Sequence, residues 1–274
     1  MIPRVQLAEV AQVNPRLPKG ANETQKVSFL AMASISENGK VLEQETRILG
    51  ETKKGYTYFE RGDVLLAKIT PCFENGKAAV VDDLEHPIGF GSTEFHVLRA
   101  DKERLNSEYL FYLLWSDQFR FLGRKVMKGA AGHKRVPAEF LSSFEIPLPR
   151  LEDQARIAYL LGKVDKLIVE RKQQLCQLNE LLKSLFLDMF GDPVRDEDGW
   201  HLTSIGNSVE IQSGQVDPRE LPYSEMYHVG GANIESESGN FINLKKAKFE
   251  SLISGKYIFD SDYILYSKIR PNTE

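Results

Sequence analysis

Cysteine and long apolar runs are both scarce in this chain. Its 274 residues include only two cysteines, Cys72 and Cys176, which lack the spacing of a metal site. We therefore expect no disulfide framework and two isolated thiols. No apolar stretch is long enough to cross a bilayer, and the first residues contain no apolar signal core. These absences predict a cytoplasmic protein with no membrane association.

The sequence also lacks the common catalytic motifs. It contains no Walker-type phosphate loop, no Gly-x-Gly-x-x-Gly, no nucleophile elbow and no His-Glu-x-x-His metal site. Its five histidines are scattered, and neither Glu51-Thr-Lys nor Glu170-Arg-Lys is a credible nuclease site. Asn14-Pro15 matches only part of an amino-methyltransferase motif and is interpreted as a turn. We expect no catalytic residue, metal or cofactor in this chain, although an enzyme site without a recognisable motif stays an alternative.

The net charge of −4 is unevenly distributed. Lys and Arg number 21 against 19 Asp and Glu in residues 1–150, 6 against 6 in 151–190, and 8 against 14 in 191–274. Residues 118–138 contain six basic residues and no carboxylate. Such a local excess suits phosphate contact, although an ordinary solvated surface is the alternative explanation.

One module occurs twice in the sequence. Three blocks align in order with an offset of 198 to 200 residues: Leu7–Val13 with Ile205–Ile211, Ala33–Glu37 with Ala232–Ser236, and Tyr58–Pro71 with Tyr257–Pro271. Chance similarity between strands is the alternative. Two copies of a module, separated by an intervening segment, indicate a protein that contacts two similar sites a fixed distance apart.

The first module is expected to be mainly β with short helices. Strand-like runs alternate with turns through residue 100, and the period then changes to that of helices from Ser107, which we expect to be an N-cap. Prolines after Phe144 favour an extended exit. With the long helix that follows and the partial second copy, the fold class is α+β.

Residues 151–190 predict one long helix with a coiled-coil seam. Apolar residues recur there in steps of three and four, interrupted by Arg171, and Gly191 and Pro193 end the helix. Another helix must cover this seam in water, so we predict a partner interface. An amphipathic helix that lies on its own domain is the alternative. The predicted interface residues are Leu161, Val164, Ile168, Leu175, Leu178, Leu182, Leu185 and Met189.

These features together resemble the specificity subunits of type I restriction–modification systems. The resemblance is carried by Ile146–Ala158, Val164–Ile168, Arg171-Lys172 and Leu181–Asp192, and by the strand Gly62–Pro71 with the basic loop 129–135. It implies a first target-recognition domain at 1–146, a helical spacer at 147–191 and an incomplete second recognition domain at 192–274. In the usual pattern two complete domains and two antiparallel spacers occur, whereas here the second copy matches only about the first 74 residues of the first.

The resemblance implies sequence-specific binding of a bipartite site on double-stranded DNA. The chemistry would belong to partners: modification subunits that use S-adenosylmethionine to methylate adenine, and a restriction subunit that uses ATP and Mg. From charge and loop position we expect DNA contacts at Lys68, Lys77, Arg124, Lys125, Lys128, His133, Lys134 and Arg135. We also expect that two chains can form a homodimer through the spacer, and that the second copy is less stable. The alternative function is a protein-interaction scaffold that does not read DNA.

Overall fold

The computed structural model describes residues 2–130, 132–192, 203–235 and 238–266. The chain divides into two compact units, Met1–Ser184 and Leu185–Glu274, and each is described by itself. Most of the long helix therefore belongs with the first unit, and the three-part division at 146 and 191 stays a prediction.

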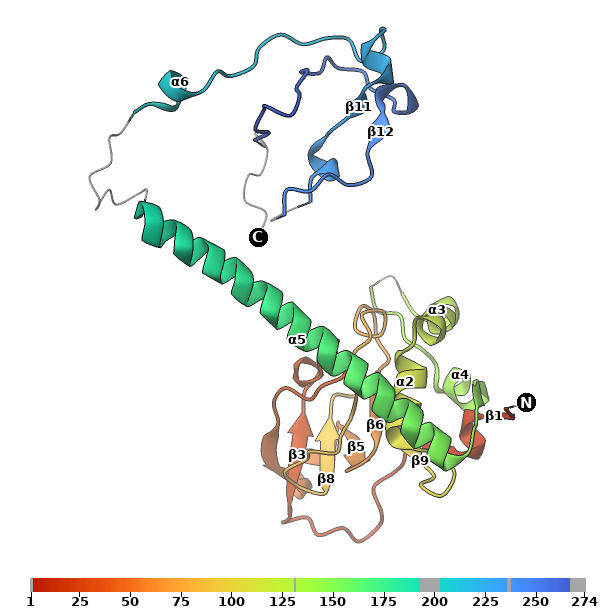
Figure 1. Ribbon diagram of the computed structural model, residues 1–274. Coiled ribbons are helices and arrows are strands. Elements are labelled where there is room, and N and C mark those ends of the chain that lie inside the picture. Colours follow the sequence, from red (N-terminus) through yellow and green to blue (C-terminus); the bar gives the residue numbers. More distant parts are fainter. Residues whose placement is uncertain (1, 131, 193–202, 236–237, 267–274) are drawn as a thin grey trace. The chain divides into compact units, whose positions relative to one another are not determined.

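The first unit contains two four-stranded sheets and a two-stranded ribbon (Figure 1). One sheet has the order β2-β9-β6-β7, with β2 Ala11–Val13, β6 Val64–Ala67, β7 Ala78–Val80 and β9 Phe95–Ala100. The other has the order β4-β3-β8-β5, with β3 Lys26–Leu30, β4 Glu45–Ile48, β5 Thr57–Glu60 and β8 Ile88–Gly91. All pairs are antiparallel except β3 with β8. The ribbon joins β1 Arg4–Gln6 to β10 Glu145–Pro147.

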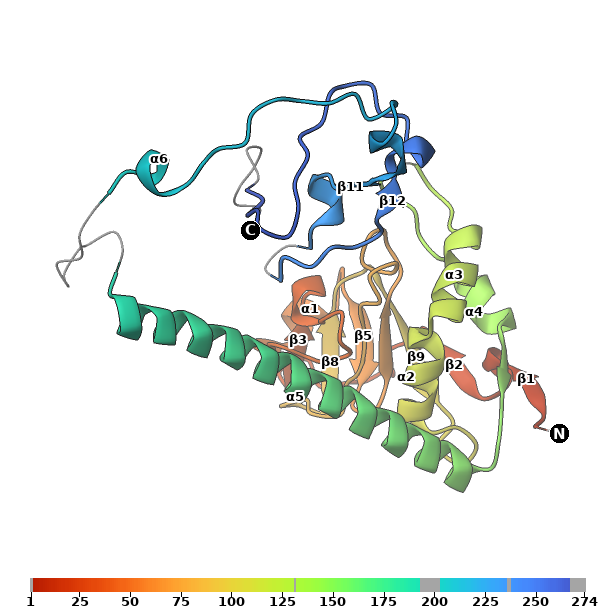
Figure 2. The same cartoon turned by 45° about the horizontal axis from the view of Figure 1, so that its top comes forward.

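Strand β6 lies between two hydrophobic layers and is buried on both faces. Val64 and Leu66 belong to the cluster that includes the helices, whereas Leu65 belongs to a cluster with Leu30 and Phe59 of the other sheet. Successive residues of a strand point to opposite faces, so one continuous apolar run serves both layers. The helices that border the first layer are α2 Ser107–Trp115, α3 Asp117–Val126 and α4 Ala138–Ser143 (Figure 2); the short α1 is Leu49–Thr52.

The predicted start of the first helical segment is wrong by one residue. Asn106, not Ser107, is the N-cap of α2, and its side chain accepts a hydrogen bond from the backbone N–H of Tyr109 at 2.9 Å. Ser107 instead donates its hydroxyl to the carbonyl of Gly62 at 2.8 Å. The helical segment is also broken at Ser116, whose hydroxyl caps α3 through the N–H of Phe119. Asn106 and Ser116 both have the short polar side chain that helix N-caps require.

Helix α5 confirms the predicted long helix and runs from Leu151 to Phe190. Its 40 residues span about 60 Å at about 1.5 Å per residue. The chain leaves the helix at Gly191, which has φ +69°, a conformation that glycine adopts without steric cost. Only Gln154 and Ala158 of the helix are buried.

The second unit repeats the hairpin of the first in the same register. Strands β11 Tyr227–His228 and β12 Lys245–Lys246 pair as the corresponding residues of β3 and β4 do. The isolated bridge Ile234↔Phe241 likewise corresponds to Ile35↔Val41. The offset changes from 199 to 200 within the connecting loop, so the alignment needs one inserted residue there. The repeat is thus present in backbone pairing as well as in sequence.

The apolar aligned residues are more buried in the first unit than in the second. Leu7 is fully buried, whereas its counterpart Ile205, in α6 Ile205–Ser208, is 73% exposed. Among described hydrophobic residues of the second unit, Ala247 is the one that is buried. The last part of the third block, 267–271, lies outside the described residues.

Candidate nucleic-acid interface

The predicted basic loop folds as a short hairpin at the end of strand β6. We call residues 128–135 the basic hairpin; residue 131 lies outside the described range. Lys128 and Arg135 exchange backbone hydrogen bonds of 3.0 and 2.8 Å, and Thr70 donates its N–H to the carbonyl of Lys134 at 3.0 Å. The hairpin is therefore joined by its backbone to the segment that follows β6, while its described residues are exposed to solvent.

Arg135 holds the hairpin to the sheet through Glu94. Its Nε and Nη2 donate to the two carboxylate oxygens of Glu94 at 2.9 and 2.8 Å, a bidentate pair. This hydrogen bonding lowers the pKa of Glu94 and raises that of Arg135. Arg135 is thus a partly neutralised member of the predicted DNA-contact set.

The exit of the hairpin rests on a buried histidine. His96 donates from Nε2 to the carbonyl of Val136 at 2.8 Å and accepts at Nδ1 from the Asn14 amide at 3.1 Å, which sets a neutral tautomer. Burial lowers the pKa of His96. The left-handed conformation of Asn14, with φ +53°, also lets its side-chain oxygen accept the N–H of Val97. Neutral His96 therefore fixes the position where Val136 leaves the hairpin.

Helix α3 adds cations immediately before the hairpin. Arg124 and Lys125 occupy its last turn, and both are exposed. The ammonium of Lys125 lies 4.2 Å from the ring centre of Phe121, which is 50% exposed. Arg120, on the same helix, is turned inward and pairs with Asp117 and the carbonyl of Glu74. The charged end of α3 and the hairpin form one basic segment in sequence.

The remaining two predicted contacts differ from this group. Lys68 follows β6, and its carbonyl accepts the N–H of Val136, so its backbone adjoins the hairpin. Lys77 instead donates its ammonium to the carbonyl of Met32 at 3.4 Å. The structure thus brings together the hairpin residues and Lys68, with Arg124 and Lys125 preceding them, but directs Lys77 toward the segment after β3.

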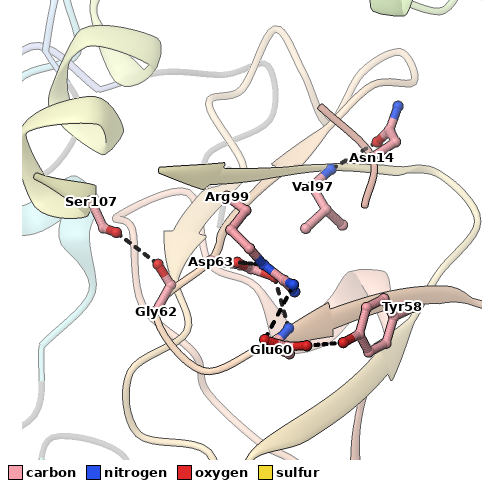
Figure 3. A network of polar contacts seen from close by, with 8 residues as sticks. All are labelled: Asn14, Tyr58, Glu60, Gly62, Asp63, Val97, Arg99 and Ser107. Carbon is pink, nitrogen blue, oxygen red and sulfur yellow. Dashed lines mark hydrogen bonds and ion pairs between the residues drawn. The ribbon is translucent and has the colours of Figure 1, made fainter. Parts of the chain in front are cut away.

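A polar network at the β5–β6 turn was missed by sequence reasoning (Figure 3). Asp63 is only 2% exposed, and the guanidinium of Arg99 donates to both of its oxygens at 2.8 Å. Arg99 also pairs with Glu60 at 3.2 Å, and Glu60 accepts from the Tyr58 hydroxyl. Burial and the adjoining carboxylate raise the pKa of Tyr58 to about 12. The alignment of Asp63 with Asp262 in the repeated module was a sequence signal that could have pointed to this network.

The predicted spacer seam is exposed along its whole length. The eight residues range from 39% exposure at Leu161 to 66% at Leu182, and none contacts a covering helix within the described chain. The surface of α5 is also apolar beyond the seam, including the paired rings of Phe186 and Phe190 at 5.1 Å. A surface of this extent is typical of an interface rather than of an isolated helix.

The start of α5 is anchored to the rest of the first unit by residues outside the seam. Gln154 accepts the N–H of Asn106 and donates to the carbonyls of Arg104 and Pro149, each at 2.9 Å. Ala158 is buried in the main core, and Asp165 accepts the Tyr112 hydroxyl at 2.7 Å. The first turns of this helix therefore lie on its own unit, whereas the partner interface along the seam stays a prediction.

Neither a metal cluster nor a membrane span appears in the part of the chain that the structure describes. No group of three or more His, Cys, Asp or Glu side chains converges there. No helix among these residues is long and apolar enough to span a bilayer.

Comparison with known proteins identifies relatives of part of this chain. Two curated relatives from Escherichia coli, the type I restriction enzyme EcoEI and EcoAI specificity subunits, are both 40% identical, over 171 and 169 residues. The matches cover 62% and 61% of this chain but only 29% and 28% of the relatives, so the aligned part is less than a third of either.

Two solved structures share the fold. One is the crystal structure of the HsdS subunit from Thermoanaerobacter tengcongensis, with a TM-score of 0.55 and 23% identity, covering 68% of this chain and 47% of that one. The other comes from work on assembly and conformational transition of the type I R-M system, with a TM-score of 0.56 and 24% identity, covering 74% and 53%. The family model described as type I restriction modification DNA specificity domain matches residues 4–180. Since that is more than half of the sequence, the chain belongs to this family of DNA specificity domains.

Proposed function

We propose that this chain is a non-catalytic specificity subunit that binds double-stranded DNA in a sequence-specific manner. The observation that carries the proposal is the exposed basic hairpin, joined to the sheet by backbone bonds and preceded by the charged end of α3. Its cations can neutralise phosphates, while a narrow hairpin with small residues at its tip can approach base edges in a groove. Because the proposed ligand is cellular DNA, we expect the protein to be located in the cytoplasm.

The enzymatic steps would belong to other chains. We expect modification subunits to bring S-adenosylmethionine for adenine methylation, and a restriction subunit to bring ATP and Mg. This chain would then require no cofactor of its own. The exposed seam of α5 is the surface that we assign to these partners, because it is apolar and uncovered in the described chain.

Selection from a randomised duplex pool tests the DNA function. The bound fraction is sequenced with and without a modification subunit, and affinity is followed by fluorescence anisotropy. We expect enrichment of a defined motif, with affinity falling about 10³–10⁵-fold between 50 and 200 mM salt if 6–10 phosphates are contacted. Absence of enrichment in both conditions would favour the alternative function, a scaffold that assembles partners through α5.

We also propose that two chains can pair their α5 helices antiparallel. Such a pair would cover both seams and place two identical recognition modules at opposite ends, which suits a palindromic interrupted site. Leu175→Arg or Leu178→Arg should abolish the dimer in sedimentation at micromolar concentration. Gln173→Arg adds the same charge outside the seam and should leave dimerisation unchanged. A wild-type chain that stays monomeric contradicts the dimer without affecting DNA binding.

A further inference from the structure

Helix α3 exposes a phenylalanine among cations. Phe121 is 50% exposed, and it is the one exposed phenylalanine among the described residues between 2 and 150. The ammonium of Lys125 lies over its ring, and Val126, which is 37% exposed, follows on the same helix. Residues 118–138 contain no carboxylate. A ligand that matches this surface must therefore offer negative charge and an apolar group together.

The opposite face of α3 is packed tightly on the core. The ring of Phe119 is buried and lies 6.0 Å from that of Phe73, between centroids. A Cβ on Gly123 would lie 2.4 Å from the Phe73 ring, so the helix and this ring approach more closely than a larger residue permits. Packing of the inner face therefore fixes the outward one, on which Gln118, Phe121 and Lys125 recur in steps of three and four.

Two polar side chains beside the ring are free to contact a ligand. Gln118 and Arg124 are exposed, and neither side chain has a hydrogen bond or ion pair within the described chain. Glutamine and arginine recognise adenine and guanine through paired hydrogen bonds, and a phenylalanine ring contacts the C5-methyl group of thymine. The major groove of DNA admits an α-helix and displays all three groups. The outward face of α3 thus has the chemistry of a helix that reads this groove.

We propose that the outward face of α3 enters the major groove and that Phe121 contacts the methyl group of one thymine. The contact makes Phe121 a specificity-determining residue, while the cations of the basic hairpin neutralise phosphates. In unmodified DNA this methyl group occurs on thymine alone, so its burial against the ring selects one base at one position. This inference rests on the proposed function, because it presupposes sequence-specific binding of DNA.

Deoxyuridine substitution tests the contact, because uracil pairs as thymine does but lacks the methyl group. In the duplex that the full wild-type chain selects, each thymine is replaced singly by deoxyuridine, and affinity is measured by fluorescence anisotropy. We expect one replacement to weaken binding about fourfold, the contribution of one buried methyl group, and the others to have little effect. In Phe121→Ala the same replacement should have no effect, since the ring that contacts the methyl group is absent.

Leu42→Ala is the matched control, because Leu42 is 62% exposed and lies outside α3 and the basic hairpin. It should keep the wild-type response to deoxyuridine. Phe121→Ala should keep the wild-type salt dependence, since it removes no charge. A response that persists in Phe121→Ala, no response at any thymine, or a selected motif without an A·T pair would each overturn the inference and leave the proposed DNA function intact. Absence of any selected motif would overturn both.

Discussion

If the basic hairpin binds DNA as proposed, Glu94 limits how many of its cations are available for that contact. Its bidentate pair with Arg135 restrains the hairpin and neutralises one cation. The two side chains are 25% and 44% exposed, so solvent screens the pair and its contribution to stability is small. Its effect on binding is expected to exceed its effect on folding.

Glu94→Gln should therefore change binding more than stability. Release of Arg135 adds a cation for phosphate, so non-specific affinity should rise and the slope of log K against log salt should steepen by about one unit. Discrimination between sequences should fall because the hairpin is less restrained. Anisotropy over a salt series measures both quantities. Glu51→Gln removes the same charge from an exposed position of α1 and should change neither quantity. Equal effects of the two variants would contradict a specific role for Glu94.

His96 should make the stability of the first unit depend on pH. Burial depresses the pKa of its folded form below the ordinary 6.5, so the unfolded chain binds a proton more readily. Stability is then complete above 6.5 and falls as pH decreases toward the folded pKa, by at most about 1.4 kcal/mol per pH unit. Denaturant titrations at pH 7.5 and 5.5 measure the fall, which His96→Gln should remove. An unchanged slope in the variant would show that another group titrates in this range.

Helix α5 combines two kinds of contact along one element. Its first turns contact the rest of the first unit through Gln154, Ala158 and Asp165, and its later turns present a seam that no described residue covers. Helix α5 is therefore joined to the rest of the first unit by packed side chains as well as by the backbone. The helix can fix the distance between two DNA-binding modules only if this joint is rigid.

Gln154→Ala tests the joint. The substitution leaves the N–H of Asn106 and the carbonyls of Arg104 and Pro149 without this partner, which should cost about 1–3 kcal/mol of unfolding free energy. Gln173→Ala makes the same change where the helix is exposed, and should cost less than about 0.5 kcal/mol. Chemical denaturation of both variants gives the comparison. Equal losses would show that the helix is not anchored through Gln154.

The two units should differ in stability across the whole chain. The first contains three buried clusters, whereas the described second unit has one buried hydrophobic residue, Ala247. Hydrogen exchange should be slowest in β6 and β9 and at least tenfold faster in β11 and β12, because fewer apolar contacts oppose local opening. Equal protection in the two hairpins would contradict this expectation.

The sequence by itself determined the periodic and repeated features. The apolar pattern predicted the helix at 151–190, and the alignment predicted a second copy, because both depend on local spacing or on similarity that one chain displays. The limits of α2 were less accurate, since Asn106 and Ser107 are both good caps and distant contacts select between them.

Only the tertiary structure decided which charges are free. Arg120, Lys77 and Arg135 have the same side-chain chemistry as their exposed neighbours, yet each meets an acceptor from a segment far away in sequence. The face of α5 that rests on the module was likewise set by Tyr112 and Asn106, which lie outside the helix. Local periodicity carries no record of such long-range partners, because they are defined by how the sheets and helices pack.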